Sequence, residues 1–182
     1  GKNFVVPQGV MAGGGGATTK ARISDSSAIP EGKSLIETKE FQAGTNPMET
    51  LMIYKLSMAA GNKDPQKDIY TEETRTMMEN WTVTPAQLKN GVRGIERCSQ
   101  FPSQIFFDKS GDLAVIRYPV KERQCHPWFL QREEGKWRLD LTIMQKCIIM
   151  NQKNQYHFRN FDHPYLFGFT DLRFDKNGYP HE

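Results

Sequence analysis

The stretch CHPWFLQREEGKWRLDLTIM, residues 125–144, contains two β-prone runs separated by a turn. The turn is Glu133-Glu134-Gly135-Lys136, where glycine permits the positive φ of a tight reversal. The sequence therefore predicts strands over 125–132 and 137–144. From Trp137 onward the side chains alternate in character, and successive side chains of a strand point to opposite faces. We expect one buried face formed by Trp137, Leu139, Leu141 and Ile143, and one polar face formed by Arg138, Asp140 and Thr142.

A second pair of β-prone runs lies just before this stretch. Residues 103–107 and 112–120 are rich in β formers, and Asp108-Lys109-Ser110-Gly111 supplies the turn between them. Two adjacent hairpins of this kind form an antiparallel meander that buries one face. This half of the chain is therefore expected to be a curved antiparallel sheet.

Helix start signals precede the strands. Asn46-Pro47, Asp64-Pro65 and Thr84-Pro85 each place a capping residue before a proline, which is favoured at the first helical position. Gln87, three residues after Thr84, completes a capping box. Three helices are expected from these positions, and a further helix is expected within 145–158. The predicted fold class is α+β, with N-terminal helices packed on the sheet.

The two ends of the chain differ from its middle. Residues 1–29 contain four consecutive glycines and many polar residues, so they read as a flexible leader in which Phe4–Val6 could dock as an extra strand. Residues 30–158 form the predicted α+β domain. Residues 159–182 are an aromatic extension, and so much aromatic surface should either wrap back onto the domain or meet a protein partner.

Composition excludes some classes of function. The chain has 24 basic and 21 acidic residues, and the basic ones are scattered among acids, so nucleic acid is not an expected partner. No apolar run approaches the roughly 20 residues of a transmembrane helix. The three cysteines, Cys98, Cys125 and Cys147, allow at most one intrachain disulfide. Buried structural thiols are the favoured interpretation, because free cysteine is among the most buried residue types.

Three segments carry a resemblance to a known superfamily: Leu113-Ala-Val-Ile-Arg-Tyr-Pro119, His126-Pro-Trp-Phe-Leu130 and Gly135-Lys-Trp-Arg-Leu-Asp-Leu141. Together with the helix-first order, they resemble the nuclear-transport-factor-2-like superfamily, a cone-shaped α+β fold. The resemblance implies that the tryptophan and leucines pack under the helices. It also implies a ligand position in the hollow between sheet and helices. The superfamily includes enzymes, transport and scaffold proteins, and domains of envelope secretion machinery, so the site must decide the function.

Catalysis in that hollow would need a shielded proton acceptor beside a polarising donor. Asp140 is the candidate acceptor, with Tyr118 and His126 on neighbouring predicted strands. The favoured alternative is that Asp140 forms an ion pair with Arg138 or Arg117 on the solvent face. The candidate ligand-binding residues of the hollow are Tyr54, Trp81, Tyr118 and Trp128.

No metal site or cofactor is expected, because no His, Cys or acidic residues show a ligand spacing. The leading hypothesis is a non-catalytic binding or assembly domain, with a small-molecule ligand or with a protein partner or second copy bound through the aromatic extension. A flexible leader also suits tethering, so a periplasmic or envelope location is favoured over the cytoplasm, in a bacterial envelope or secretion-related assembly. The alternative is a small-molecule lyase or isomerase that uses general acid–base chemistry.

Overall fold

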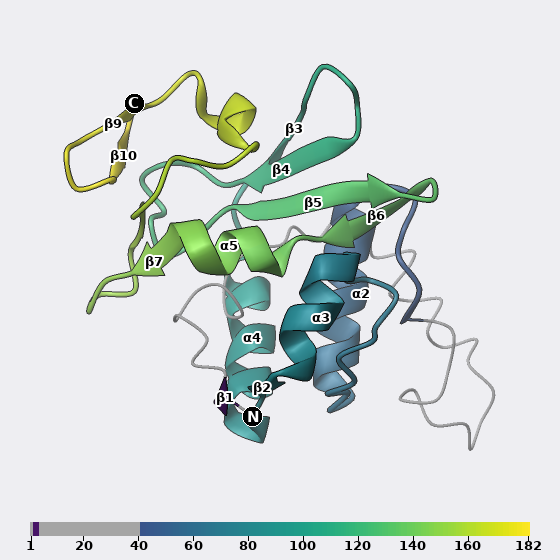
Figure 1. Cartoon of the computed structure of the whole chain (residues 1–182). Coiled ribbons are helices and arrows are strands. Elements are labelled where there is room, and N and C mark those ends of the chain that lie inside the picture. Colours follow the sequence, from purple (N-terminus) through teal and green to yellow (C-terminus); the bar gives the residue numbers. More distant parts are fainter. Residues whose placement is uncertain (1, 4–40) are drawn as a thin grey trace.

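The computed structural model describes residues 2–3 and 41–182 (Figure 1). The predicted leader therefore lies outside the described residues except for positions 2–3, and so does the docking of Phe4–Val6. The helices are α2 (Pro47–Ala59), α3 (Glu72–Glu79), α4 (Pro85–Cys98), α5 (Leu141–Cys147) and the 3₁₀ helix η4 (Leu166–Phe169). The strands are β1 (Lys2–Asn3), β2 (Trp81–Thr82), β3 (Gln104–Phe107), β4 (Leu113–Arg117), β5 (Trp128–Glu133), β6 (Lys136–Leu139), β7 (Ile148–Met150), β8 (Tyr156–Phe158), β9 (Arg173–Phe174) and β10 (Pro180–His181).

The central sheet is the predicted antiparallel meander, with the order β3-β4-β5-β6. Its register pairs Ile116 with Trp128 and Leu130 with Leu139. The turn between β5 and β6 contains two residues of positive φ, Glu134 at 54° and Gly135 at 75°. The expected hairpin turn is therefore confirmed, and the α+β class with an antiparallel sheet is confirmed with it.

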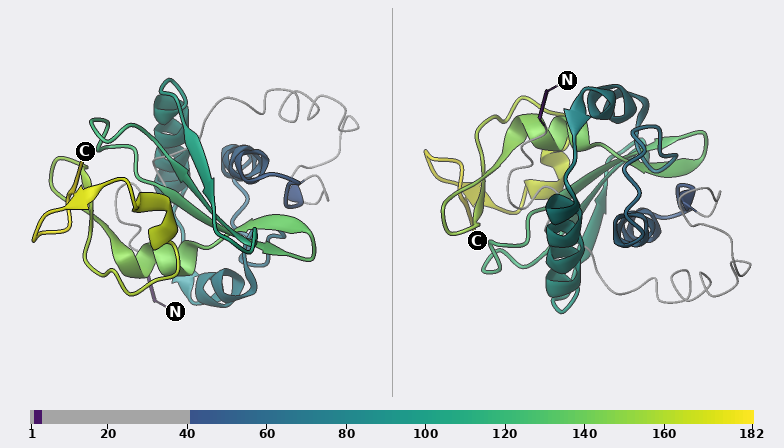
Figure 2. Two further views of the ribbon diagram at one scale, coloured as in Figure 1. Left: turned by 90° about the horizontal axis from the view of Figure 1, so that it is seen from above. Right: turned by 90° about the horizontal axis from the view of Figure 1, so that it is seen from below.

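Both faces of this sheet are buried. Trp128 contacts Tyr54 of α2 at a ring-centroid distance of 6.0 Å, whereas its neighbour Phe129 stacks on Tyr165 at 4.3 Å. Adjacent strand residues point to opposite faces, so the two contacts lie in different layers. Figure 1 shows α2, α3 and α4 on one side of the sheet and the C-terminal segment on the other, and Figure 2 shows α4 running beneath the strands. We call these the helix layer (α2–α4) and the C-terminal layer (residues 159–182).

Two of the three predicted helix starts are confirmed. Asn46 caps α2 by accepting a hydrogen bond from the Glu49 backbone, and Pro47 is its first residue. Thr84 caps α4, and the capping box with Gln87 is complete in both directions. These signals are local, because each depends on atoms three residues apart.

The third start is wrong, because no helix begins at Pro65. The Asp64 carboxylate instead accepts from the Gln66 backbone and closes a short turn. The following backbone bonds to the edge of β6, where Leu139 N–H donates to the Ile69 carbonyl at 2.7 Å. Pairing with the sheet therefore delays the helix, and α3 begins at Glu72 with Thr71 as its cap.

The predicted strand over 137–144 is also wrong in its second half. Strand β6 ends at Leu139, Asp140 caps a helix, and α5 occupies Leu141–Cys147. The expected alternation therefore stops where a capping side chain becomes available. The helix expected within 145–158 is wrong too, because after α5 the chain forms the hairpin β7–β8.

The aromatic C-terminal extension packs onto the domain. Tyr165 and Phe169 are 0% and 3% exposed, and they belong to the same apolar cluster as Phe129. Gly168 lies against Val115, where an added Cβ would stand 2.7 Å from a Val115 methyl group, so only glycine fits this contact. Among the described residues, no helix has the length and apolar character that crossing a bilayer requires.

Candidate ligand pocket and the buried residues behind the sheet

Asp140, the candidate proton acceptor, caps α5 and lies buried beside Tyr165. It is 5% exposed, and its Oδ1 accepts from the Ile143 backbone at 3.1 Å as the cap of α5. Its Oδ2 accepts from the Tyr165 hydroxyl at 2.7 Å. Burial raises the pKa of this carboxyl, and the Tyr165 hydrogen bond opposes that rise. Both carboxylate oxygens are therefore engaged by the protein itself.

The expected ion pair of Asp140 with Arg138 or Arg117 on the solvent face is wrong. Arg138 donates to Asp68 at 2.9 Å, and Arg117 pairs with Asp171. The reason is the helix that begins at Leu141, because it turns Asp140 away from the alternating strand pattern on which the expectation was based.

A pocket of about 310 Å³ lies where β4 meets the C-terminal layer. Its volume is at the lower end of the range for small-molecule sites. Tyr118, a candidate ligand-binding residue, is part of its wall. The full lining is Gln104, Arg117, Tyr118, Pro119, Val120, Asp171, Leu172 and Glu182.

Arg117 makes one wall of this pocket rigid. Its guanidinium donates twice to the Asp171 carboxylate, both times at 2.7 Å, and once to the Gly168 carbonyl at 2.7 Å. The ring of Phe106 lies 4.6 Å from the guanidinium carbon. Arg117 is 5% exposed, so these hydrogen bonds replace the water that would otherwise solvate its charge. The pair is neutral as a whole, and the pocket therefore does not present an open cation to an anionic ligand.

The hollow behind the sheet is filled by its own side chains. Tyr54 and Trp128, two of the candidate ligand-binding residues, are each 0% exposed and contact one another edge to face. Tyr70 contacts Tyr54 in the same manner. Rings from α2, from the segment before α3 and from β5 therefore form one buried aromatic cluster.

A lysine that sequence reasoning missed is part of this cluster. The Lys67 Nζ donates to the Ser57 Oγ at 3.1 Å and lies 5.6 and 5.5 Å from the ring centroids of Tyr54 and Tyr70. Burial lowers the pKa of Lys67 to about 7, against the opposing charge of Asp64. No sequence signal marked this lysine, because it stands in a polar run between Gln66 and Asp68 that is typical of a solvated loop.

The remaining candidates, Tyr118, His126 and Trp81, form no hydrogen bond with Asp140 among the described contacts. Tyr118 and His126 follow β4 and precede β5, so both lie at one end of this strand pair. His126 is 0% exposed, and burial lowers its pKa to about 3. Trp81 is half-buried on β2, which Figure 1 shows far from β4.

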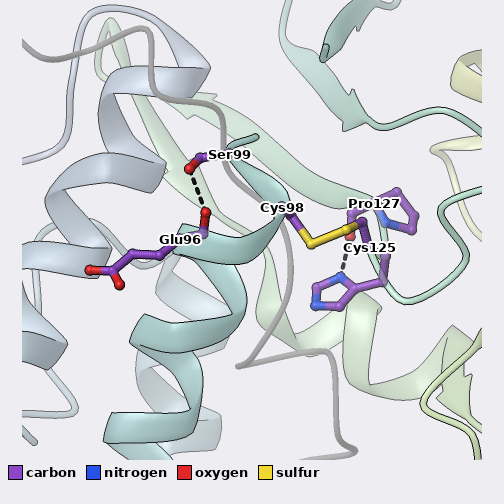
Figure 3. Close-up of a disulfide and its surroundings, with 6 residues drawn as sticks. Glu96, Cys98, Ser99, Cys125 and Pro127 are labelled. Atoms are coloured by element: carbon purple, nitrogen blue, oxygen red, sulfur yellow. Dashed lines mark hydrogen bonds between the residues drawn. A yellow bond between two sulfur atoms is a disulfide. The ribbon is translucent and has the colours of Figure 1, made fainter. Parts of the chain in front are cut away.

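A disulfide joins the helix layer to the sheet. Cys98, the last residue of α4, is bonded to Cys125, which precedes β5 (Figure 3). The favoured interpretation of the cysteines as buried thiols is therefore wrong for these two and holds for Cys147, which is free and buried. Spacing along the chain could not reveal the pairing, because 27 residues separate the two cysteines.

The described residues include no group of three or more His, Cys, Asp or Glu side chains that could hold a metal ion. Comparison with protein-family models, with curated proteins and with solved structures gave no match. The function must therefore be argued from the geometry of the site.

Proposed function

We propose that this chain is a non-catalytic binding domain that holds a small polar molecule in the pocket between β4 and the C-terminal layer. The observation that carries the proposal is the pocket itself, whose wall is preformed by the Arg117–Asp171 pair. A preformed wall lowers the entropic cost of binding, since its side chains are already ordered. Because the lining adds the Glu182 carboxylate to this neutral pair, the pocket favours a neutral ligand over an anionic one.

The alternative, a lyase or isomerase, has less support. A general base needs a free lone pair within reach of the substrate. Asp140 is 5% exposed and His126 is 0% exposed, and neither residue lines the described pocket. These two candidate acid–base groups are therefore enclosed, which supports binding over catalysis.

We also propose an oxidising compartment such as the bacterial cell envelope. The Cys98–Cys125 bond supports this location, because structural disulfides persist mainly outside the reducing cytosol. The location is tested by isolating the protein from the cytosol and from the periplasm of an expressing bacterium and alkylating free thiols in denaturant, because all three cysteines are buried in the folded chain. We expect one alkylated cysteine in the periplasmic protein, because Cys98 and Cys125 are bonded there. Three alkylated cysteines in the periplasmic protein would contradict the proposed location.

Membership of the nuclear-transport-factor-2-like superfamily remains part of the proposal. Helices followed by an antiparallel meander support it. Two features differ from what the resemblance implied. The last strand of the sheet ends at Leu139 and is followed by α5. The hollow between sheet and helices is filled by Tyr54 and Trp128. An experimental structure with a ligand bound in the pocket and not in the hollow would set this domain apart from that pattern.

The binding proposal is tested by filling the pocket. Gln104 is exposed and lines it, so Gln104→Trp should block entry while leaving the fold intact. The matched control is Gln66→Trp, an exposed glutamine between α2 and α3. Native mass spectrometry of the purified wild type and control should detect a co-purified small molecule that Gln104→Trp lacks. Equal ligand occupancy in all three proteins would contradict the pocket as the site.

Assembly through the C-terminal extension is a second candidate function, favoured by two exposed apolar side chains in that segment. Phe161 is 40% exposed and Leu166 is 39% exposed, whereas most of the other aromatic residues of the segment are covered. Light scattering at micromolar concentration should show a multimer that Phe161→Ser with Leu166→Ser converts to a monomer. A wild-type monomer would contradict self-association, and pull-down with and without these substitutions then tests a protein partner.

A further inference from the structure

Two buried polar atoms at the start of β5 lack a hydrogen-bond partner among residues 41–182. They are Nε2 of His126 and Nε1 of Trp128, and both residues are 0% exposed. Their rings lie 4.7 Å apart between centroids. Buried polar groups in folded proteins nearly always have a partner, either in the protein or in bound water. Two unsatisfied atoms on contacting rings therefore point to a common partner.

The contact of His126 Nδ1 determines which ring nitrogen carries the proton. Nδ1 lies 2.7 Å from the Pro127 carbonyl, which can only accept, so Nδ1 carries the proton. His126 is enclosed in a site with no acidic partner among its described contacts, and burial favours the neutral ring. Nε2 is then an acceptor. The Trp128 Nε1–H is a donor and nothing else. The two atoms thus have complementary roles.

We propose that a neutral hydroxyl group bridges these residues, accepting from Trp128 Nε1–H and donating to His126 Nε2. A hydroxyl is the smallest group that both donates and accepts. It belongs either to a bound water molecule or to a small hydroxylated ligand. A cation would leave the Trp128 donor unpaired, and a carboxylate would leave the His126 acceptor unpaired.

A third buried polar atom without a partner in the described part of the chain lies at the same end of the β4–β5 strand pair. The Tyr118 hydroxyl is also buried and without a partner among the described residues, and Tyr118 is 3% exposed. It stands one residue after β4, at the end of the strand pair where His126 precedes β5. Tyr118 also lines the pocket described above.

The test is made on the unmodified protein by NMR of the tryptophan side chains. Three indole N–H resonances are expected, from Trp81, Trp128 and Trp137. The Trp128 resonance should show a cross-peak to a hydroxyl proton, and His126 should carry its proton on Nδ1. A cross-peak at the water frequency identifies bound water. A cross-peak to another resonance, with extra mass in the native spectrum, identifies a ligand.

Variants supply the control. His126→Phe keeps the ring and removes the acceptor, so it should abolish the cross-peak at Trp128, whereas Trp81→Phe should leave it unchanged. The inference is overturned if the wild-type Trp128 indole shows no hydroxyl cross-peak and a high-resolution crystal structure shows no density at roughly 2.7–3.2 Å from both nitrogens. Because these two observations use the wild type, the outcome stands even if His126→Phe fails to fold.

Discussion

The helix layer and the C-terminal layer both cover the central sheet, yet only the helix layer contains a buried cation that has no carboxylate partner among the described residues. On the C-terminal side, Arg117 is paired with Asp171, and Asp140 receives a hydrogen bond from Tyr165. On the helix side, Lys67 is buried with a single hydroxyl partner, and no described carboxylate lies at ion-pair distance. The helix layer has a covalent link instead, the Cys98–Cys125 disulfide. Both layers therefore contain a paired arginine, since Arg138 bonds Asp68 beside the helix layer, and the helix layer differs in holding Lys67 without a carboxylate partner and in its cross-link.

The largest expected loss of stability comes from removing the ring of Phe129, which stacks on Tyr165 of the C-terminal layer. Phe129→Ala deletes a fully buried ring that stacks on Tyr165, and such truncations cost about 3–5 kcal/mol of unfolding free energy. Phe107→Ala, at a side chain that is 53% exposed, is the control and should cost much less. Urea denaturation of both variants measures the difference. Equal losses would mean that the C-terminal layer contributes little to the core.

The next largest loss of stability is expected when the disulfide between α4 and the sheet is removed. Cys98→Ala with Cys125→Ala should lower the unfolding free energy by about 2–4 kcal/mol, because the unfolded chain gains freedom when a loop of this length opens. Adding a reductant should destabilise the wild type similarly and leave the double variant unchanged. Cys147→Ala is the control, since Cys147 is free, and it should respond to reductant as the wild type does.

The buried lysine should make stability depend on pH in one direction. The pKa of Lys67 is about 7 in the folded chain and 10.5 without burial, so above pH 7 the unfolded chain binds a proton that the folded chain lacks. Stability should therefore rise from pH 7 to pH 9, by up to about 1.4 kcal/mol per pH unit. Lys67→Met should flatten this rise, and Lys63→Met, at an exposed site, should retain it. Parallel curves for wild type and Lys67→Met would contradict the assignment.

The smallest expected effect comes from removing the hydrogen bond between Tyr165 and the buried Asp140 carboxylate on the C-terminal side of the sheet. Tyr165→Phe removes the donor to Asp140 Oδ2 and should cost about 1–3 kcal/mol. The raised pKa of Asp140 means that its ionisation opposes folding as pH increases, and the lost hydrogen bond leaves the ionised form less compensated. The loss should therefore be larger at pH 7 than at pH 4 in denaturation measurements. Tyr179→Phe, at a half-buried tyrosine, should show no such dependence on pH.

Local signals made much of the fold predictable. The caps of α2 and α4 and the turn at Glu134 and Gly135 depend on atoms a few residues apart, and these predictions are confirmed. The pattern from Trp137 to Leu139 identified a strand for the same reason. The strand expected beyond Leu139 was wrong because an aspartate in an alternating run resembles the polar face of a strand, whereas Asp140 caps the helix that follows it.

The candidate site was only partly predictable. Tyr54, Tyr118, His126 and Trp128 were identified as aromatic or titratable residues of the predicted hollow, and the structure places Tyr54, His126 and Trp128 in one contact network. Lys67 and Asp171 were not identified, because their partners Ser57 and Arg117 lie 10 and 54 residues away. Residue type alone could not show which polar groups become buried together.

By itself the sequence determined the helix-first order, the two hairpins and their turns, since caps, prolines and alternating side chains act over a few residues. Only the tertiary structure decided that both faces of the sheet are covered, that Cys98 meets Cys125, and that Asp140 is enclosed by Tyr165. These outcomes depend on segments distant in the chain, and the free energy that selects them comes from burying their apolar surface together.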